Sequence, residues 1–398
     1  MDAPDILSSD HASPKPQVTW SSIASIDTNP AIPVPTPEIT PARIPFTRFL
    51  ESSPPNPLAS NSLAPEATYS DLDIDSLPEI SPATASRLVQ IEEIRFGIRE
   101  LVMAVAWSPD GNMLAVSAGN YVYWHDAKTL KELNRYHLGS LTHSIGFSPN
   151  NRWFAAGSRD GFVRVWDLGF NPIAGSAEPF LDISAHKKGV NSVAFSPDSS
   201  TLASGGNDAV ARLWDAQTGE LLGLTIGGSY TVPAITFTPD GLTLAVLNGK
   251  VIRMRQIGSE RIVGTIQAEN PLYSMAFSQD GKTLATGNLD NLVQLWDPEQ
   301  VFRTGQEDYP ESVLLEGHSG KGASYRSLIW KVVFSLDGSL LASTGGDAAI
   351  RLWDVVKREP VAILLGHVGG VTCVAFYSGA RLLASGGLDG TIRIWGVR

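Results

Sequence analysis

The chain has 398 residues, of which 43% are hydrophobic, an ordinary share for a globular protein and enough for one large domain or two smaller ones. The net charge of −11 is unevenly spread, because residues 1–85 hold 11 acidic and 3 basic side chains (−8) and the remainder carries only −3. A nearly neutral larger part excludes a nucleic-acid surface built on bulk positive charge. The single cysteine, Cys373, excludes an intramolecular disulfide and a zinc site made of several cysteines.

The sequence contains no apolar run of the ~18–20 residues that a membrane-spanning helix needs. Its first residues also lack the basic and apolar regions of a secretory signal. We therefore expect no transmembrane segment and a cytoplasmic location. An extracytoplasmic location stays open if the natural start lies upstream. The dispersed histidines and the absence of a phosphate-binding glycine loop predict neither a metal site nor a cofactor.

The first part of the chain is rich in proline, since 15 of the 26 prolines lie in residues 1–85. The densest stretch, NPAIPVPTPEITPARIP at residues 29–45, favours extended, polyproline-like backbone. We predict that residues 1–80 form a disordered acidic tail or linker and that the folded domain is residues 81–398. The alternation DLDIDSL at residues 71–77 is either a docking motif or simply solvated tail.

Two short elements are predicted between the tail and the rest of the chain. Ser81 followed by Pro82 is typical of a helix start, with serine as the cap and proline at the first helical position. The apolar segment Leu88–Phe96 (LVQIEEIRF) resembles a strand that lacks three preceding partners in the sequence.

A repeated pattern fills the chain from there to its last residue. A motif of the type [WF]-S-P-D-G lies between two short β-rich runs, and two further runs follow each copy. Four short strands per unit, repeated at spacings of 40 to 57 residues, indicate the blades of a propeller. The copies begin at Trp107, Phe147, Phe195, Phe237, Phe277, Phe334 and Phe376.

The seventh copy ends at Arg398, directly after its third strand, TIRIWGVR. Without a fourth strand this blade would present an open edge. We predict that Leu88–Phe96 supplies it and closes the ring by pairing with Thr391–Trp395. The fold predicted is therefore all-β, a seven-bladed propeller of four-stranded antiparallel blades with repeats over about residues 101–398.

Two dipeptides recur at fixed places in the repeats: Gly-His at 317–318 and 366–367, and Trp-Asp at 166–167, 214–215, 296–297 and 353–354. With these motifs the chain resembles the WD-repeat family of β-propellers, in the form of the seven-repeat bacterial proteins, over about residues 88–398. The resemblance implies a buried hydrogen-bonded set of His, Ser or Thr, Asp and Trp in each complete blade. The sets are His186, Ser204, Asp208 and Trp214; His318, Ser343, Asp347 and Trp353; and His367, Ser385, Asp389 and Trp395.

Other blades match this pattern only in part. The second has Asp160 and Trp166, with His137 as a possible histidine, and the fifth has no histidine. A Ser–His–Asp set can also indicate a hydrolase, but a catalytic triad needs an exposed nucleophile beside an oxyanion site. Three copies at the spacing of the blades favour a structural role, so we predict no catalytic residue.

One column of the repeat follows no rule of size or polarity. Four positions before each motif stand Met103, His143, Asn191, Pro233, Tyr273, Trp330 and Thr372. We predict that this column lies on an accessible rim, because exposed aromatic and arginine side chains are typical of binding hot spots. The alternative is exposed loop residues without a partner. The predicted partner-binding residues are Trp330, Tyr273, Tyr325, Arg326, Lys331, His143, Met103, Arg159 and Asn191.

The entry into the sixth repeat is longer than its counterpart in the seventh. His318 and Phe334 are 16 positions apart, whereas His367 and Phe376 are 9 apart. We predict that the added residues form a partner-facing loop and that deletion of Lys321–Leu328 would spare the propeller and remove recognition.

Together these features predict a monomeric, non-catalytic scaffold that binds a protein or peptide on the rim, with no nucleic acid as partner. Two alternatives remain open. One is a small-ligand-binding or hydrolytic propeller that uses the central channel near Lys331. The other is a structural propeller whose tail does the binding.

Overall fold

The structure is a computed structural model of the whole chain, and it describes residues 73–97, 100–170, 178–225, 228–259, 261–304, 311–319 and 328–398. The chain divides into residues 1–65 and a second unit, Glu66–Arg398, to which every described residue belongs. The predicted tail lies outside the described residues as far as residue 72.

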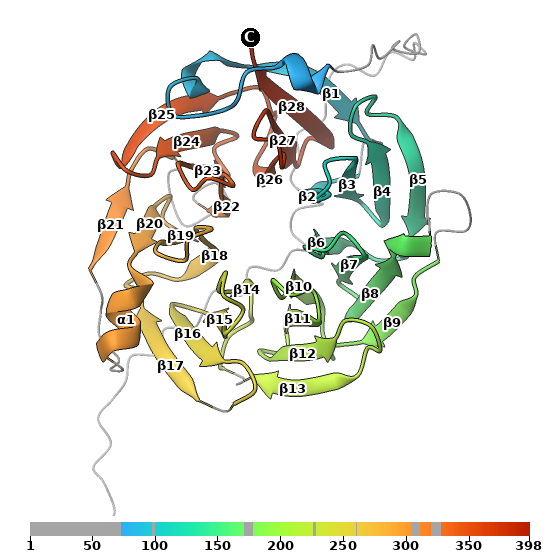
Figure 1. The fold of residues 1–398 in the computed structure, drawn as a ribbon, viewed down its shortest axis with the longest axis vertical. Coiled ribbons are helices and arrows are strands. Elements are labelled where there is room, and N and C mark those ends of the chain that lie inside the picture. Colours follow the sequence, from blue (N-terminus) through green and yellow to red (C-terminus); the bar gives the residue numbers. More distant parts are fainter. Residues whose placement is uncertain are drawn as a thin grey trace, which may run out of the picture. The chain divides into compact units, whose positions relative to one another are not determined.

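The described strands form seven four-stranded antiparallel sheets, arranged as blades around a central axis (Figure 1). The prediction of an all-β, seven-bladed propeller is confirmed. The innermost strands are β2 (Val102–Trp107), β6 (Thr142–Phe147), β10 (Val190–Phe195), β14 (Ile235–Phe237), β18 (Leu272–Phe277), β22 (Ile329–Phe334) and β26 (Val371–Phe376). The second strands are β3 (Met113–Ala118), β7 (Trp153–Ser158), β11 (Thr201–Gly206), β15 (Thr243–Asn248), β19 (Leu284–Asn288), β23 (Leu340–Gly345) and β27 (Leu382–Gly387).

The outer half of each blade follows in chain order. The third strands are β4 (Tyr121–Asp126), β8 (Phe162–Asp167), β12 (Ala211–Asp215), β16 (Val251–Gln256), β20 (Val293–Trp296), β24 (Ile350–Asp354) and β28 (Thr391–Val397). The outermost strands are β5 (Glu132–His137), β9 (Leu181–Ser184), β13 (Leu221–Thr225), β17 (Ile262–Gln267), β21 (Ser312–Leu315), β25 (Glu359–Leu364) and β1 (Leu88–Arg95). The first six blades therefore each use four consecutive strands, and the seventh combines β26–β28 with β1.

The hydrophobic core is distributed among the junctions between blades. Each of seven clusters of buried residues joins two adjacent blades, as where Trp153 of β7 packs with Trp214 of β12. Alternating side chains of a strand point to opposite faces of its sheet, so every blade buries both faces against its neighbours. The ring thus has no single centre of hydrophobic packing, and each blade depends on the two beside it.

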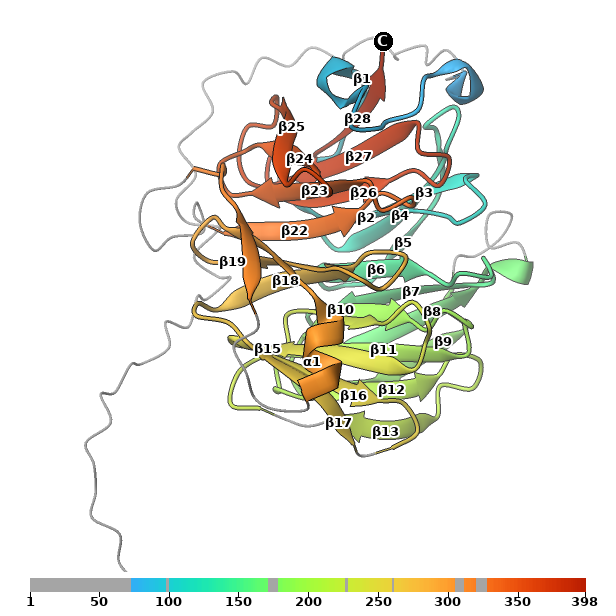
Figure 2. The same cartoon turned by 60° about the vertical axis from the view of Figure 1, so that its left-hand side comes forward.

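One short helix, α1 (Pro298–Thr304), lies between β20 and β21. Its Val301 is buried and belongs to the cluster that joins the fourth and fifth blades, which fixes the helix against β17 (Figure 2). Nowhere in the described part of the chain does a helix combine the length and the apolar character that crossing a bilayer requires.

The motif S-P-D-G forms the turn between the first and second strands of a blade. In the sixth blade, the Ser335 hydroxyl donates to Asp337 Oδ1 at 2.5 Å and its oxygen accepts the Leu340 N–H at 2.9 Å. Asp337 Oδ1 also accepts the Ser339 N–H at 3.1 Å. Serine and aspartate in such turns replace backbone hydrogen bonds by side-chain ones, which explains why the motif repeats.

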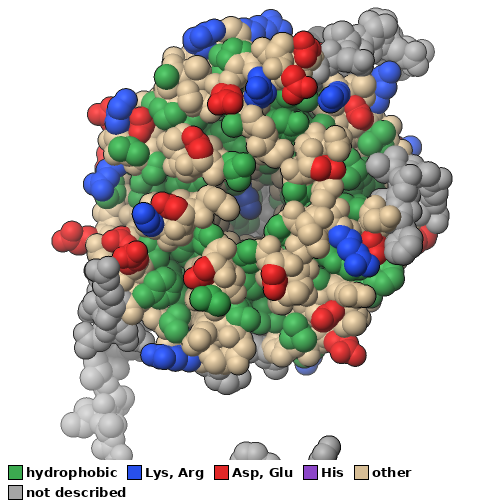
Figure 3. All heavy atoms as spheres, in the orientation of Figure 1, with side chains coloured by type: hydrophobic (Ala, Val, Ile, Leu, Met, Phe, Trp, Pro, Cys, Tyr) green, Lys and Arg blue, Asp and Glu red, His purple; other side chains and the backbone are tan. Residues whose placement is uncertain are grey.

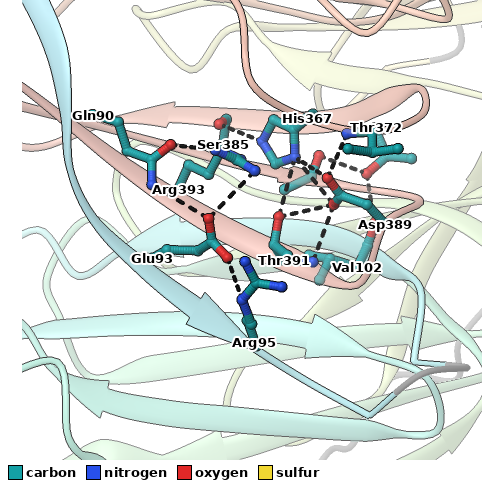
Figure 4. A network of polar contacts seen from close by, with 12 residues as sticks. Gln90, Glu93, Arg95, Val102, His367, Thr372, Ser385, Asp389, Thr391 and Arg393 are labelled. Atoms are coloured by element: carbon teal, nitrogen blue, oxygen red, sulfur yellow. Dashed lines mark hydrogen bonds and ion pairs between the residues drawn. The ribbon is translucent and has the colours of Figure 1, made fainter. Parts of the chain in front are cut away.

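The closing strand pairs as predicted. β1 runs antiparallel to β28, with Gln90 opposite Trp395 and Arg95 opposite Thr391, and the pairing continues to Val397. Figure 4 shows how side chains reinforce this junction: Arg393 donates to Gln90 and forms an ion pair with Glu93 at 3.3 Å. The ring is thus closed by residues from the two ends of the described propeller.

The described residues include 73–80, which belong to the predicted tail, and this segment packs on the propeller. Ile74 and Ile80 are buried, Ile80 N–H donates to Ala380 at 2.7 Å, and the Arg381 guanidinium donates to the carbonyl of Leu77. These contacts lie at the one turn where the repeat has no S-P-D-G-type motif. The predicted helical turn is a 3₁₀ turn at Ala85–Arg87, so its first residue is later than the sequence indicated.

Candidate functional site in the central channel

The structure brings together the residues of the three complete hydrogen-bonded sets. In the third blade, Trp214 Nε1–H donates to Ser204 Oγ at 2.9 Å, and Ser204 Oγ lies 2.9 Å from His186 Nε2. His186 Nδ1 lies 2.8 Å from Asp208 Oδ1. A carboxylate accepts only, so the network assigns the proton to Nδ1 and makes Nε2 the acceptor of the serine hydroxyl. The sixth and seventh blades repeat this arrangement through His318, Ser343, Asp347 and Trp353, and through His367, Ser385, Asp389 and Trp395.

An arginine that sequence reasoning missed completes two of these sets. Arg212 donates to Asp208 Oδ2 at 2.9 Å, and Arg351 donates to Asp347 Oδ2 at 2.7 Å. The arginine stands four residues after the aspartate, which is a signal the sequence does contain. In the seventh blade the Thr391 hydroxyl donates to Asp389 at 2.8 Å instead.

The second blade uses arginine in place of histidine. Arg164 donates to Ser158 Oγ and to Asp160 Oδ2, both at 3.0 Å. The predicted histidine, His137, is exposed on β5 and packs against Tyr121, with ring centroids 4.7 Å apart. The suggestion that His137 belongs to the set is therefore wrong, because its strand places it on the outer edge of the preceding blade.

A glycine at the end of the second strand makes room for the histidine ring. A Cβ atom at Gly206 would lie 2.2 Å from His186 Nδ1, and one at Gly387 would lie 2.9 Å from His367 Nδ1. Any side chain there would displace the imidazole from its aspartate. The repeated Gly-Gly pairs therefore serve the hydrogen-bonded sets.

The low pKa values of the aspartates in these sets make the free energy of unfolding of the propeller depend on pH. Burial alone would raise the pKa of Asp347, but the hydrogen bond from His318 and the charge of Arg351 outweigh it and hold the pKa well below 3.8. Asp389 is held low in the same way by His367. Such carboxylates add to the free energy of unfolding. Their contribution is fully present above the pKa of the unfolded state, near 3.8, and is lost as the pH falls through the lower pKa of the folded state. We expect urea unfolding to show a marked loss of stability below about pH 4, smaller in Asp347→Asn. If Asp347→Asn lost as much stability as the wild type below about pH 4, the carboxyl group of Asp347 would not be a source of this pH dependence.

The variable column of the repeat coincides with a β-bulge. In six blades the pairing of the innermost with the second strand shifts at this residue, and Pro233 lies just before β14. A bulge leaves one residue out of the ladder and redirects its side chain. The bulge residues are Met103, His143, Asn191, Tyr273, Trp330 and Thr372.

These side chains form the wall of the central channel, and this changes the predicted location. All seven residues of the column line one cavity of about 110 Å³ on the axis. Met103, Trp330 and Thr372 are buried, and His143, Asn191 and Tyr273 are half-buried. The expected accessible rim is therefore wrong for this column, because the bulge turns the side chains towards the axis.

Several lining side chains already have partners in the protein. Asn191 Nδ2 donates to Asn207 Oδ1 at 2.9 Å and to the Val232 carbonyl at 3.2 Å. The Trp330 ring packs edge-on against Tyr273, with centroids 5.5 Å apart. Burial, assisted by the charge of Arg159, lowers the pKa of His143 to about 4, so this imidazole is neutral at physiological pH. These residues shape the wall of the channel.

Lys331 is the cation of this channel. It is the single lysine or arginine among the eighteen residues that line the cavity, and Figure 3 shows a basic side chain inside the central opening. Its side chain is exposed to the channel, which is lined by residues of all seven blades. This enclosure lowers the pKa of Lys331, and it raises that of the neighbouring Cys373 thiol to about 12.

Arg159 occupies a different place from the column residues. It is exposed in the turn between β7 and β8, beside the loop that leads into the third blade, whose Lys187 and Lys188 are also exposed. We name these three residues the basic corner. It lies on the same end of the blades as the loops that connect one blade to the next.

The long loop before the sixth blade falls only partly within the described residues. Tyr325 and Arg326 lie outside them, so their predicted roles stay predictions. Leu328 is described and buried, and its carbonyl accepts the Gly346 N–H at 3.0 Å. The deletion predicted to spare the propeller therefore removes a residue that the sixth blade uses, and it should end before Leu328.

The family model "WD domain, G-beta repeat" matches the chain at residues 97–126, 130–167, 178–215, 260–297, 311–354 and 358–396. The unmatched interval, residues 216–259, contains most of the fourth blade. Arg255 stands there in the place of the tryptophan, and the turn aspartate is missing. The structure nevertheless shows that β14–β17 form a complete sheet.

The chain is 30% identical over 227 residues to the WD repeat-containing protein SL1-17 of Schistosoma mansoni, covering 56% of this chain and 69% of that protein. It is 26% identical over 259 residues to the serine-threonine kinase receptor-associated protein of Gallus gallus, covering 65% and 67%. A match to the U3 snoRNP-associated protein-like YAOH of Oryza sativa subsp. japonica, 29% identical over 117 residues, spans 22% of that protein. With its repeats matched over more than half of its length, the chain belongs to the WD-repeat family.

Proposed function

We propose that this propeller is a non-catalytic scaffold that binds a protein or peptide on the face formed by its inter-blade loops, around the mouth of the channel. The observation that supports this best is the contrast between positions of the repeat that keep the same residue types and positions that vary. The hydrogen-bonded sets and the turns repeat from blade to blade, whereas the bulge residues differ in every blade. A repeat array needs no such variation for folding, so the bulge residues that are only half-buried, among them His143 and Tyr273, are available for recognition at the mouth of the channel.

The Ser–His–Asp sets support a structural reading over a catalytic one. Ser204, Ser343 and Ser385 are fully buried, and each serine oxygen already accepts a hydrogen bond from a tryptophan. A nucleophile has to reach its substrate, and these hydroxyls lie between blades.

The name of one relative, a serine-threonine kinase receptor-associated protein, also fits a role in protein association. The basic corner gives the loop face of this chain a cationic region, which favours a partner with complementary acidic side chains. Charged groups at the edge of an interface mainly set the rate of association and its salt dependence. We further expect the unbound propeller to be a monomer and nucleic acid not to be its partner.

The test compares two charge-reversed variants in affinity capture with quantitative mass spectrometry. Changing Arg159, Lys187 and Lys188 to Glu should reduce recovery of the partners about 10-fold or more, since it replaces attraction by repulsion. The matched control changes Lys128, Lys131 and Lys282 to Glu, which are exposed on the opposite end of the blades. Equal recovery with both variants would sink the proposal for this face.

A second candidate function is the binding of a small ligand in the channel. The observation that favours it is Lys331, an exposed ammonium group inside a cavity.

A further inference from the structure

The residue equivalent to Lys331 has a structural task in two of the other blades. The equivalent residues are Ala104, Ser144, Ser192, Ala234, Ser274 and Cys373. Ser144 Oγ accepts the Val193 N–H at 3.1 Å, and Ser192 Oγ accepts the Ile235 N–H at 3.2 Å, so each serine connects its blade to the next. An ammonium group accepts no hydrogen bond, so Lys331 cannot make this connection. The scaffold alone therefore does not account for a lysine here.

The charge of Lys331 is not balanced within the channel. Its ammonium group makes no hydrogen bond and no ion pair with another described residue, and the lining of the cavity contains no aspartate or glutamate. An anion that enters the channel therefore meets an ammonium group without a competing carboxylate.

A further hydrogen-bond donor, Tyr273, lines the same cavity from the adjacent strand β18. Burial raises the pKa of Tyr273 to about 12, so the phenol keeps its proton and is able to donate. The buried Ser274 on the same strand does not contribute, because its Oγ lies 2.8 Å from where a Cβ atom at Gly287 of β19 would stand, which is away from the axis.

We propose that Lys331 and Tyr273 form a subsite for a carboxylate group, which an acidic side chain or the C-terminus of the bound peptide inserts into the channel. The inference rests on the proposed function and names the chemistry of the partner. One ammonium and one hydroxyl donor balance a single negative charge, which fits a carboxylate better than a phosphate dianion. A cavity of about 110 Å³ holds a small group of this kind.

The turns between the first and second strands lie at the end of the channel away from the inter-blade loops. These turns carry exposed carboxylates: Asp110, Asp198, Asp240, Asp280 and Asp337. Acidic side chains are visible around the opening in Figure 3, and they repel an anion that approaches from this end.

The test titrates the full-length protein with defined probes and follows the indole signal of Trp330 by NMR, assigned with Trp330→Phe. The probes are glutarate, a capped Gly-Gly-Glu-Gly-Gly peptide and the same peptide with Gln in place of Glu. We expect the Glu peptide to shift the signal saturably at millimolar concentration and the Gln peptide to leave it unchanged. Binding of glutarate alone would assign the carboxylate to a free acid instead of a partner.

Two variants separate the subsite from nonspecific charge effects. Lys331→Met keeps the length of the side chain and should weaken binding of the carboxylate probe about 10-fold or more. Lys282→Met, in an exposed turn at the opposite end, should leave it unchanged. Unchanged affinity in Lys331→Met, or no saturable shift with either carboxylate in the wild type, overturns the subsite. The capture experiment is independent of this outcome, so partners lost with the basic corner but no carboxylate binding would leave the proposed function standing.

Discussion

Replacing Asp347 by alanine is expected to lower the free energy of unfolding of the propeller by about 3–5 kcal/mol. The Asp347 side chain is 6% exposed and accepts hydrogen bonds from His318 and Arg351, which are themselves buried. Without the carboxylate, the guanidinium stays enclosed with no counter-charge and the imidazole N–H has no acceptor. The measurement is urea unfolding at pH 7 followed by circular dichroism.

The fifth blade supplies the control for this substitution. Asp290 occupies the same place in the repeat, but its blade has no histidine and its side chain is exposed. Asp290→Ala should therefore change the free energy of unfolding by less than about 1 kcal/mol. Similar losses in both variants would show that the turn itself, and not the hydrogen-bonded set, needs the aspartate.

Removal of residues 1–95 is expected to abolish the monodisperse folded propeller. It deletes β1 and exposes the edge of β28, a strand ready to pair with another chain. It also removes Ile74, Ile80 and Leu88 from the hydrophobic clusters of the first, sixth and seventh blades, each buried side chain contributing about 1.5–3 kcal/mol. Size-exclusion chromatography and thermal unfolding should show aggregation or a greatly lowered melting temperature.

A shorter truncation distinguishes the closing strand from the tail. Removal of residues 1–72 leaves every described contact in place and should change the melting temperature by no more than about 2 °C. A synthetic peptide of residues 73–97 should restore the elution volume of the longer truncation. If the chain without β1 is as stable as the full chain, closure by this strand does not hold the ring together.

The sequence was sufficient for the ring and its closure because both depend on repetition. The strands and turns of each blade recur along the sequence, so the one repeat that lacks a fourth strand can be recognised. Similar blades bury their apolar faces by packing side by side in a ring. The turn between the first and second strands of the seventh blade departs from the repeated motif, and the sequence did not indicate why. Residues 377–380 lack the turn motif, and only the structure shows that the segment around Ile80 packs there.

The location of the variable column could not be derived from spacing alone. A bulge adds one residue to a strand without changing the hydrophobic pattern on either side of it, so the sequence shows a residue of free identity but not its direction. Trp330 illustrates the result: predicted for an accessible rim, it is 5% exposed and packs on Tyr273. The arginines of the hydrogen-bonded sets were missed for a different reason, since arginine is most often a surface residue.

The closing of the ring also affects the order in which the protein can fold during its synthesis. β1 leaves the ribosome first among the described strands, but Arg393, which bonds to Gln90, follows 303 residues later. At ~5–20 residues per second, β1 waits about 15–60 s for its partner strand. During that time it is an unpaired strand tethered to an array that already presents six complete blades. A chaperone that binds β1, or a slow encounter of the two ends, would therefore determine how much of the protein reaches the closed ring.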